Sequence, residues 1–279
     1  MQRSERFLDK VVFISGAARG IGRATALAFA REGAHLVVCD VCRQDSTVPY
    51  DLARPDELTI LAREIESMGR RVIAAQADVT DLVVMQALAD RTLQELGPID
   101  IVMANAGVYC FAPSWELTEE QWDHTIDVCL KGTWITCKVF IPQMLPHRGG
   151  KIVCMSSTAG LKGMANLVHY VAAKHGILGI VKTLAIELAP YDINVNAVCP
   201  TSVDTAMNRN DALYREFATD ASMATHEQML VQMNRLNLFP NRNLLAPEDI
   251  SASVLWLASE EARHITGTAL PVDAGYVTK

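Results

Sequence analysis

The stretch VVFISGAARGIGRATALAFAR, residues 11–31, decides the fold of this chain. It begins with an apolar run of strand length, continues through a turn with Gly16, Gly20 and Gly22, and ends in a helical pattern from Arg23 to Arg31. These glycines permit a tight turn and let backbone N–H groups approach a pyrophosphate at the helix N-terminus, where the helix dipole favours an anion. The order strand, glycine turn, helix predicts a dinucleotide-binding βαβ unit.

Asp40 lies about 20 residues beyond this turn, where the second apolar run ends. Its carboxylate can accept hydrogen bonds from both hydroxyls of an adenosine ribose and would repel a 2′-phosphate, so NAD is expected in preference to NADP. Arg19 and Arg43 favour the opposite choice, because either guanidinium could bind a phosphate. Arg19 and Ile21 of the turn are also expected to contact the dinucleotide.

Short apolar runs alternate with longer helical patterns, which is typical of an α/β fold whose parallel sheet is buried on both faces. The runs of strand length are residues 11–15, 36–40, 72–76, 99–104, 151–156, 194–198 and 268–272. We therefore expect residues 1–279 to form a single doubly wound Rossmann-type domain. Its sheet should be mostly parallel and seven-stranded, with helices on both faces.

Local signals mark the ends of several helices. The expected starts are Pro55, Thr118 with Gln121 as a capping box, and Pro247, and Gly69 ends the first of these helices.

Composition excludes several classes of protein. Hydrophobic residues make up 50% of the 279 positions, which suits one compact domain with a large core. The net charge of −7 leaves no basic excess for a phosphate backbone, so a nucleic-acid partner is not expected. No apolar run approaches the ~18 residues of a membrane span, and residues 1–10 are charged where a signal peptide would be apolar. We expect a cytoplasmic protein without a membrane partner.

The seven cysteines are odd in number and scattered between Cys39 and Cys199, which indicates core residues and no disulfide framework. Cys39 and Cys42 form a C-x-x-C, but no second pair or His cluster accompanies them. Inert thiols are therefore expected over a redox or metal site, and no metal is expected.

Two long segments interrupt the alternation. Residues 41–54 are polar and turn-rich, and loops of this length inside compact domains tend to be functional or mobile. Residues 206–245 are rich in Met and Asn, with weak helical periodicity and no strand pattern. They fall between two strands on the ligand side of the sheet, which favours a substrate lid. The alternative is an excursion that packs outside the core.

Apolar side chains of this lid could form a hydrophobic pocket with residues that follow Asn105. The candidates are Met207, Met223, Met229, Met233 and Leu236 in the lid, with Tyr109, Phe111 and Trp115 beyond Asn105. Met at helical spacing is also typical of ordinary core, so both interpretations stay open.

Two more strands end in residues suited to a cofactor. Asp78-Val79 follows the third run, and Asn105-Ala106-Gly107 follows the fourth. Open α/β sheets bind ligands at the carboxyl ends of their strands, so contact with the dinucleotide is expected. A helix cap or turn at Asp78, and a link between strands at Asn105, are alternatives that can coexist with that contact.

Ser157 follows the fifth run, Tyr170 comes 13 residues later, and Lys174 lies one helical turn beyond Tyr170 on the same face. Oxidation of an alcohol by NAD needs a base near pH 7, and lowering a phenol pKa from ~10 takes about 4 kcal/mol. An ammonium ~4 Å away contributes about that much at an effective dielectric of ~20, although burial of the phenol opposes it. Ser157 would stabilise the substrate oxygen.

With these residues in view, the chain from Lys10 onward resembles the short-chain dehydrogenase/reductase family. The motifs that carry the resemblance are Gly16, Gly20 and Gly22, the N-A-G of Asn105 to Gly107, and Ser157, Tyr170 and Lys174. The resemblance implies an oxidoreductase with Ser157, Tyr170 and Lys174 as catalytic residues. It also implies that Tyr170 and Lys174 contact the cofactor.

The segment after Asp40, together with residues 200–205 and 270–275, is similar to carveol dehydrogenase-like, mycofactocin-associated members of the family. This likeness implies that residues 41–54 cover a nicotinamide cofactor that stays bound and is reoxidised by an external redox carrier. A simple surface insertion is the alternative. The remaining cofactor contacts expected here are Pro200, Val203 and Thr205.

The sequence departs from the family at Cys129, in Val128-Cys129-Leu130-Lys131-Gly132, where relatives carry Asn. That Asn helps to hold a water that passes protons from the lysine toward solvent. A thiol lacks its amide donor and acceptor, although the backbone carbonyl at the same position could still bind the water.

We therefore expect an NAD-dependent dehydrogenase that interconverts a secondary alcohol, apolar and cyclic, with its ketone. A nucleotide-binding sensor or scaffold with little turnover is the alternative; Cys129 favours it and the intact Ser157, Tyr170 and Lys174 oppose it. Family members are usually tetramers, and helix faces around Trp134 and Val181 could pair between subunits.

Overall fold

The sheet positions everything else in this protein. In the computed structural model, which describes residues 5–218, 224–240 and 242–279, seven parallel strands form one sheet in the order β3-β2-β1-β4-β5-β6-β7. The strands are β1 Val11–Ser15, β2 His35–Asp40, β3 Val72–Gln76, β4 Ile101–Ala104, β5 Gly150–Met155, β6 Ile193–Pro200 and β7 Ala269–Val272. The order reverses beside β1, between β1 and β4, which opens a crevice at the carboxyl ends of the strands.

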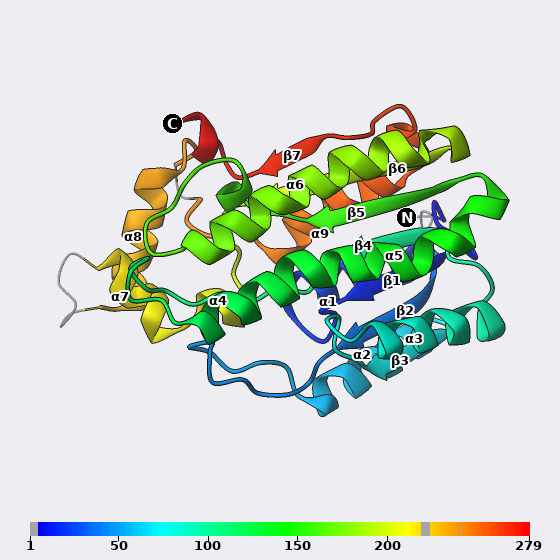
Figure 1. The fold of residues 1–279 in the computed structure, drawn as a ribbon, viewed down its shortest axis with the longest axis horizontal. Helices are drawn as coiled ribbons and strands as arrows, with labels where there is room; N and C mark the ends of the chain where they lie inside the picture. The colour runs from blue at the N-terminus through cyan, green and yellow to red at the C-terminus, as the bar shows by residue number, and fades with distance from the viewer. Residues whose placement is uncertain (1–4, 219–223, 241) are drawn as a thin grey trace.

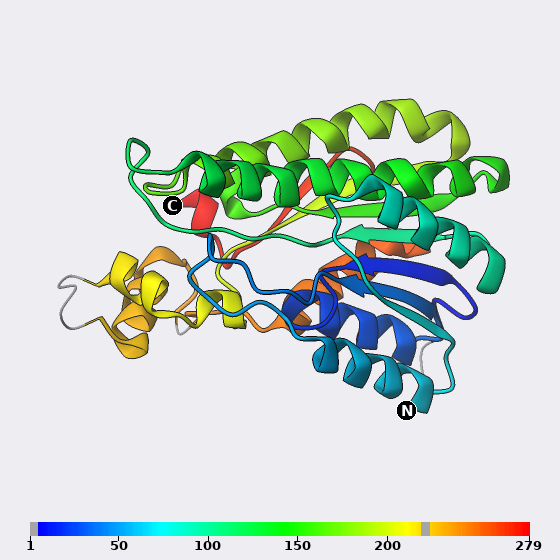
Figure 2. The same ribbon diagram turned by 60° about the horizontal axis from the view of Figure 1, so that its bottom comes forward.

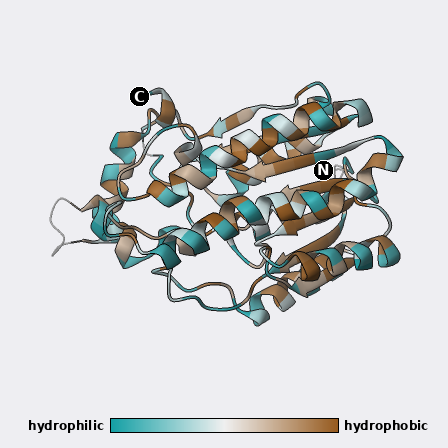
Figure 3. Cartoon of the chain, viewed as in Figure 1, coloured by the Kyte–Doolittle hydropathy of each residue, from teal (hydrophilic) through white to brown (hydrophobic). Residues whose placement is uncertain are grey.

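Both faces of the sheet are covered by helices (Figure 1). Val12 and Ile14 of β1 pack toward one face, and Val11 and Phe13 toward the other. The first face is covered by α1 Gly20–Arg31, α2 Pro55–Ser67 and α9 Pro247–Ala258. The second is covered by α3 Leu82–Glu95, α5 Gly132–Met144 and α6 Val168–Leu188. The continuous apolar runs of the strands therefore reflect burial on both sides, and Figure 3 shows the hydrophobic colour concentrated along the strands and the inward sides of the helices.

The expected fold class is confirmed, with corrections at element ends. Helix α1 begins at Gly20 and not at Arg23, because the second half of the glycine turn already forms its first helical turn behind the extended Arg19. Strand β4 starts at Ile101 and not at residue 99, while β6 continues to Pro200. Thr118 caps α4, Glu119–Ile126, by accepting a hydrogen bond from the N–H of Gln121, as predicted.

The two long segments lie at the same end of the molecule (Figure 2). The insertion, residues 41–54, contains turns and extended chain but no helix or strand. The described part of 206–245 contains a short 3₁₀ helix, Ala206–Asn208, and helices α7, Asp211–Phe217, and α8, His226–Leu236. Met223 lies outside the described residues.

Several smaller expectations can be compared with the structure. All seven cysteines are free and buried, and burial raises the pKa of Cys42 to about 12. Of the two residues named for a subunit contact, Val181 is buried in the chain's own core and Trp134 is exposed. Within the described residues, no helix is long and apolar enough to cross a membrane.

Candidate active site

The glycine turn lies against the loop that follows β4. Gly16 has a φ of +61°, and a Cβ atom there would sit 2.9 Å from the Cα of Ala106. A Cβ at Gly22 would lie 2.2 Å from the carbonyl oxygen of Gly16. Only a residue without a side chain fits at either place, so the backbone N–H groups at the start of α1 stay open to an anion.

Asp40 closes β2 beside this turn. One oxygen of its carboxylate accepts a hydrogen bond from the N–H of Ala18 at 3.1 Å, which orients the side chain toward the turn. Burial raises the pKa of Asp40, while the hydrogen bond from Ala18 and the charge of Arg19 oppose that rise. The carboxylate of Asp40 therefore lies beside the glycine turn and lines the same cavity.

Asp78 and Asn105 both have structural roles. Asp78 accepts hydrogen bonds from the N–H and hydroxyl of Thr80, and its second oxygen pairs with Arg43 at 3.1 Å. The side chain of Asn105 donates to the carbonyl oxygens of Ser15 and Gly16 at 2.9 and 3.1 Å, which holds β4 to the turn after β1. Both side chains still border the cavity described next.

A cavity of about 550 Å³ extends from the glycine turn to the described part of residues 206–245, the segment expected to form a lid. Among the sequence-predicted residues that line it are Gly16, Arg19, Gly20, Ile21, Asp40, Asp78, Val79, Asn105, Ala106, Gly107, Ser157, Tyr170, Lys174, Pro200, Val203 and Thr205. Gly22 does not line it and packs beneath the turn instead. Residues as far apart in sequence as Gly16 and Tyr276 therefore border one space.

Only some of the apolar residues expected to form a hydrophobic pocket line the cavity. Met207, Leu236, Tyr109 and Phe111 line the cavity, as expected. Met229 and Met233 do not, because they are buried in the lid's own small core with Leu213. Trp115 is 85% exposed and does not line the cavity.

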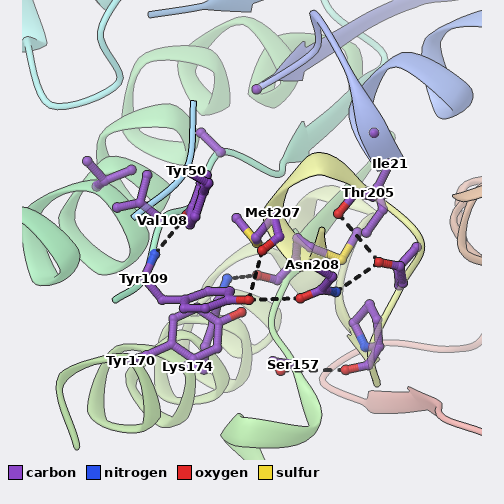
Figure 4. Close-up of a pocket in the computed structure, with 18 of the residues that line it drawn as sticks. Ile21, Tyr50, Val108, Tyr109, Ser157, Tyr170, Lys174, Thr205, Met207 and Asn208 are labelled. Atoms are coloured by element: carbon purple, nitrogen blue, oxygen red, sulfur yellow. Dashed lines mark hydrogen bonds between the residues drawn. The ribbon is translucent and has the colours of Figure 1, made fainter. Parts of the chain in front are cut away.

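The reacting end of the cavity is formed by α6 and the loop after β5 (Figure 4). Lys174 donates a hydrogen bond from Nζ to the carbonyl oxygen of Met155 at 2.7 Å, and Nζ lies 5.3 Å from the centre of the Tyr170 ring. The hydroxyl of Ser157 accepts from the N–H of Ala159 at 3.1 Å and donates to the carbonyl of Pro200 at 3.5 Å. The second contact is long and weak, so the serine proton is easily redirected.

Two effects of opposite sign act on the pKa of Tyr170. Burial raises it, and this effect exceeds the lowering by the charge of Lys174 and by the hydroxyl of Ser157. Lys174 thus acts in the expected direction, and burial, which was expected to oppose it, is the larger effect. Part of this desolvation comes from the ring of Tyr109, which packs against Tyr170 with ring centres 5.3 Å apart.

Cys129 lies in a single π-helical turn, Asp127–Lys131, behind Lys174. Its thiol donates to the carbonyl oxygen of Val108 at 3.2 Å and accepts from the N–H of the same residue at 3.4 Å. Its own carbonyl oxygen accepts from the hydroxyl of Thr133 at 2.7 Å. Burial raises the pKa of Cys129, so it acts as a neutral link to the loop after β4.

The insertion is tied across the cavity at several points. Arg43 pairs with Asp78, and the guanidinium of Arg19 donates to the carbonyl oxygen of Asp51. The hydroxyl of Tyr50 accepts from the N–H of Tyr109 at 3.1 Å. Val48 and Leu52 pack against Val108. Both arginines that might have favoured NADP therefore have partners within or beside the insertion.

Sequence reasoning missed several residues that line the cavity, among them Tyr50, His124, Asn208 and Glu216. Tyr50 lies in the insertion, whose length was the available signal. The other three belong to helical segments whose side-chain directions depend on tertiary packing, and no local motif marks them.

Comparisons with known proteins agree with this geometry. The family model for short chain dehydrogenases matches residues 10–215. The chain is 43% identical to (-)-trans-carveol dehydrogenase of Rhodococcus erythropolis over 277 residues, which covers 98% of this chain and 99% of the relative. It is 39% identical over 268 residues to an uncharacterized NAD-dependent oxidoreductase of Mycobacterium tuberculosis, covering 95% of each chain.

Solved structures give the same result. Carveol dehydrogenase from Mycobacterium avium, in complex with NAD, has a TM-score of 0.96 at 38% identity and covers 99% of this chain and 100% of its own. A short chain dehydrogenase from Mycobacterium paratuberculosis, bound to NAD, has a TM-score of 0.89 at 36% identity, covering 98% and 100%. The cofactor named for these relatives is the predicted one, NAD. The chain belongs to the short-chain dehydrogenase/reductase family.

Proposed function

We propose that this protein is an NAD-dependent dehydrogenase that interconverts a secondary alcohol, apolar and cyclic, with its ketone. The enzyme class follows from the family and from the NAD-linked relatives. The observation that carries the proposal is the convergence of Ser157, Tyr170 and Lys174 on the cavity that begins at the glycine turn. A nucleotide cradle and a proton-accepting group thus share one space.

In this proposal Tyr170 takes the alcohol proton. Lys174 is fixed by Met155 and stabilises the resulting phenolate, while Ser157 exchanges its weak bond to Pro200 for one to the substrate oxygen. When bound, NAD would supply the hydride acceptor and a positive charge that would stabilise the phenolate, whereas burial destabilises it. The glycine turn and Asp40 would hold its pyrophosphate and adenosine ribose.

The substrate class is inferred from the lid side of the cavity. Its walls there are mainly apolar, with Met164, Phe111, Leu213, Phe217 and Leu236. Such walls favour a hydrocarbon ring over a polar chain. The relatives named carveol dehydrogenase support an alcohol of this kind.

We further propose that the insertion covers the cofactor. Its ties to Asp78 and Tyr109 lie at the two ends of the cavity, the cofactor end and the end near Tyr170. NAD would therefore leave slowly, and an external redox carrier would reoxidise it in place.

A cytoplasmic location and a tetramer, with the exposed Trp134 in a subunit contact, stay predictions; light scattering would measure the assembly.

The test is single-turnover reduction of NAD by a panel of alcohols, followed by absorbance of the reduced nicotinamide. We expect cyclic apolar secondary alcohols to react faster than acyclic polar or primary ones, and Tyr170→Phe to lose the reaction while still binding NAD. If wild type binds NAD but reduces none with any alcohol, the sensor or scaffold interpretation replaces this proposal. A preference for polar substrates would contradict the assigned substrate class alone.

A further inference from the structure

Tyr109 lies at the centre of the site but belongs to none of the recognised motifs. It follows the N-A-G loop after β4, and it is 6% exposed although it lines the cavity. Figure 4 places its ring between Tyr50, Tyr170 and the lid residues Met207 and Asn208. This one side chain therefore contacts the insertion, Tyr170 and the segment after β6.

The hydroxyl of Tyr109 holds the lid. It donates toward the side-chain oxygen of Asn208 at 2.8 Å and toward the carbonyl oxygen of Met207 at 3.0 Å. A phenol has one proton, so the two acceptors share it. Asn208 in turn donates from Nδ2 to the carbonyl oxygen of Val203 at 2.8 Å, and this bond fixes the orientation of the amide. A continuous chain of hydrogen bonds therefore joins Tyr109 to the segment after β6.

The backbone N–H of Tyr109 binds Tyr50 of the insertion, and its ring packs against Tyr170. Its N–H donates to the hydroxyl of Tyr50 at 3.1 Å, and the two ring centres are 5.8 Å apart. Its ring meets that of Tyr170 edge to face, with centres 5.3 Å apart. Burial raises the pKa of Tyr109 well above the usual range, so the hydroxyl keeps its proton.

We propose that Tyr109 is a positioning residue that couples the lid to the insertion and to Tyr170. Substrate entry through the lid requires the bond between Tyr109 and Asn208 to open, and its re-formation closes the site over the bound alcohol. A second tie, from Nδ2 of Asn166 to both oxygens of Glu216 at 3.0 and 3.1 Å, holds α7 independently. The proposal rests on the proposed dehydrogenase function and on residues 206–245 acting as a substrate lid.

The test uses Tyr109→Phe, which removes the hydroxyl and keeps the ring. We expect KM for the alcohol to rise about five- to tenfold, the effect of one hydrogen bond, with kcat changed less than about twofold. Hydrogen exchange in residues 206–217 should become faster. Asn208→Leu should also raise KM, and the double variant should be clearly less than additive, because both substitutions remove the bond between Tyr109 and Asn208. Each substitution removes one further bond, Tyr109 to Met207 or Asn208 to Val203, and these two contributions should add. Tyr191→Phe, at an exposed tyrosine away from the cavity, is the matched control.

A wild-type KM in Tyr109→Phe, or fully additive effects in the double variant, would overturn the coupling. If no alcohol is turned over even by wild type, the proposed function fails, and hydrogen exchange still decides this inference. Unchanged exchange in residues 206–217 of Tyr109→Phe then refutes the tie between Tyr109 and the lid.

Discussion

Nζ of Lys174 donates a 2.7 Å hydrogen bond to the carbonyl oxygen of Met155, the last residue of β5. The lysine is 2% exposed, and this bond holds its charge beside the Tyr170 ring. The carboxyl end of β5 thereby fixes the position of the ammonium group. The spacing of Tyr170 and Lys174, one helical turn apart, fixes the position of the phenol relative to it.

Lys174→Met should reduce kcat for alcohol oxidation by at least about 100-fold. The 5.3 Å separation between Nζ and the ring centre corresponds to about 3 kcal/mol of phenolate stabilisation at an effective dielectric of ~20. Steady-state kinetics at saturating NAD measures the effect, and thermal unfolding controls for loss of the fold. Lys174→Arg, which keeps the charge, should lose less; equal losses would show that charge is not the cause.

The pH dependence should report the desolvation of Tyr170. Alcohol oxidation needs the deprotonated form of Tyr170, and burial raises the pKa of this phenol. The kcat for oxidation should therefore increase as the pH rises toward that pKa. Tyr109→Ala removes the covering ring and admits water, which lowers the pKa of Tyr170 and moves the acid limb of the pH profile to lower pH. Tyr109→Phe keeps the ring and should leave the limb in place. An upward shift in Tyr109→Ala would contradict this account.

Asp40→Ala should weaken NAD binding by about 10- to 100-fold and reduce the preference over NADP, because two hydrogen bonds to the ribose and the repulsion of a 2′-phosphate are lost together. Fluorescence titration with each nucleotide measures both affinities. Asp90→Asn, on the exposed face of α3, is the matched control. If Asp40→Ala prefers NAD over NADP as strongly as wild type, the carboxylate does not determine the choice of cofactor.

Arg43→Met should speed NAD release about two- to fivefold, because its pair with Asp78 holds the insertion at one end of the cavity. The Arg43 side chain is 68% exposed, so the contribution is small and should weaken with added salt. Gel filtration of the loaded protein, followed by assay of the retained nucleotide, gives the measurement, with the exposed Arg63→Met on α2 as control. Equal retention by the two variants would mean that the pair does not hold the cover.

Cys129→Ala should lower the free energy of unfolding by about 1–3 kcal/mol, since it leaves the buried N–H and carbonyl of Val108 without the thiol. Cys129→Ser keeps a donor and an acceptor and should lose less. Urea unfolding compares the three proteins. If alanine is as stable as serine, the thiol contacts contribute nothing beyond packing.

Part of this structure is determined by short stretches of sequence. The glycine turn, the alternating apolar runs and the spacing of Tyr170 and Lys174 each depend on a few neighbouring residues, so the βαβ order, the sheet and the candidate site could be predicted from sequence. The start of α1 was missed because Gly20 to Gly22 serve both as turn and as first helical turn.

Other properties depend on contacts between distant segments. Met207 lines the cavity whereas Met229 is buried in the lid's own core, although both lie in one Met-rich segment. Likewise, no local pattern predicts that Tyr109 bonds to Asn208, 99 positions away, or that burial outweighs Lys174 in setting the pKa of Tyr170. Sequence determined which chemical groups are present and which share a helix face. Desolvation and side-chain direction were decided by the tertiary structure, because both depend on which remote atoms exclude water around a group.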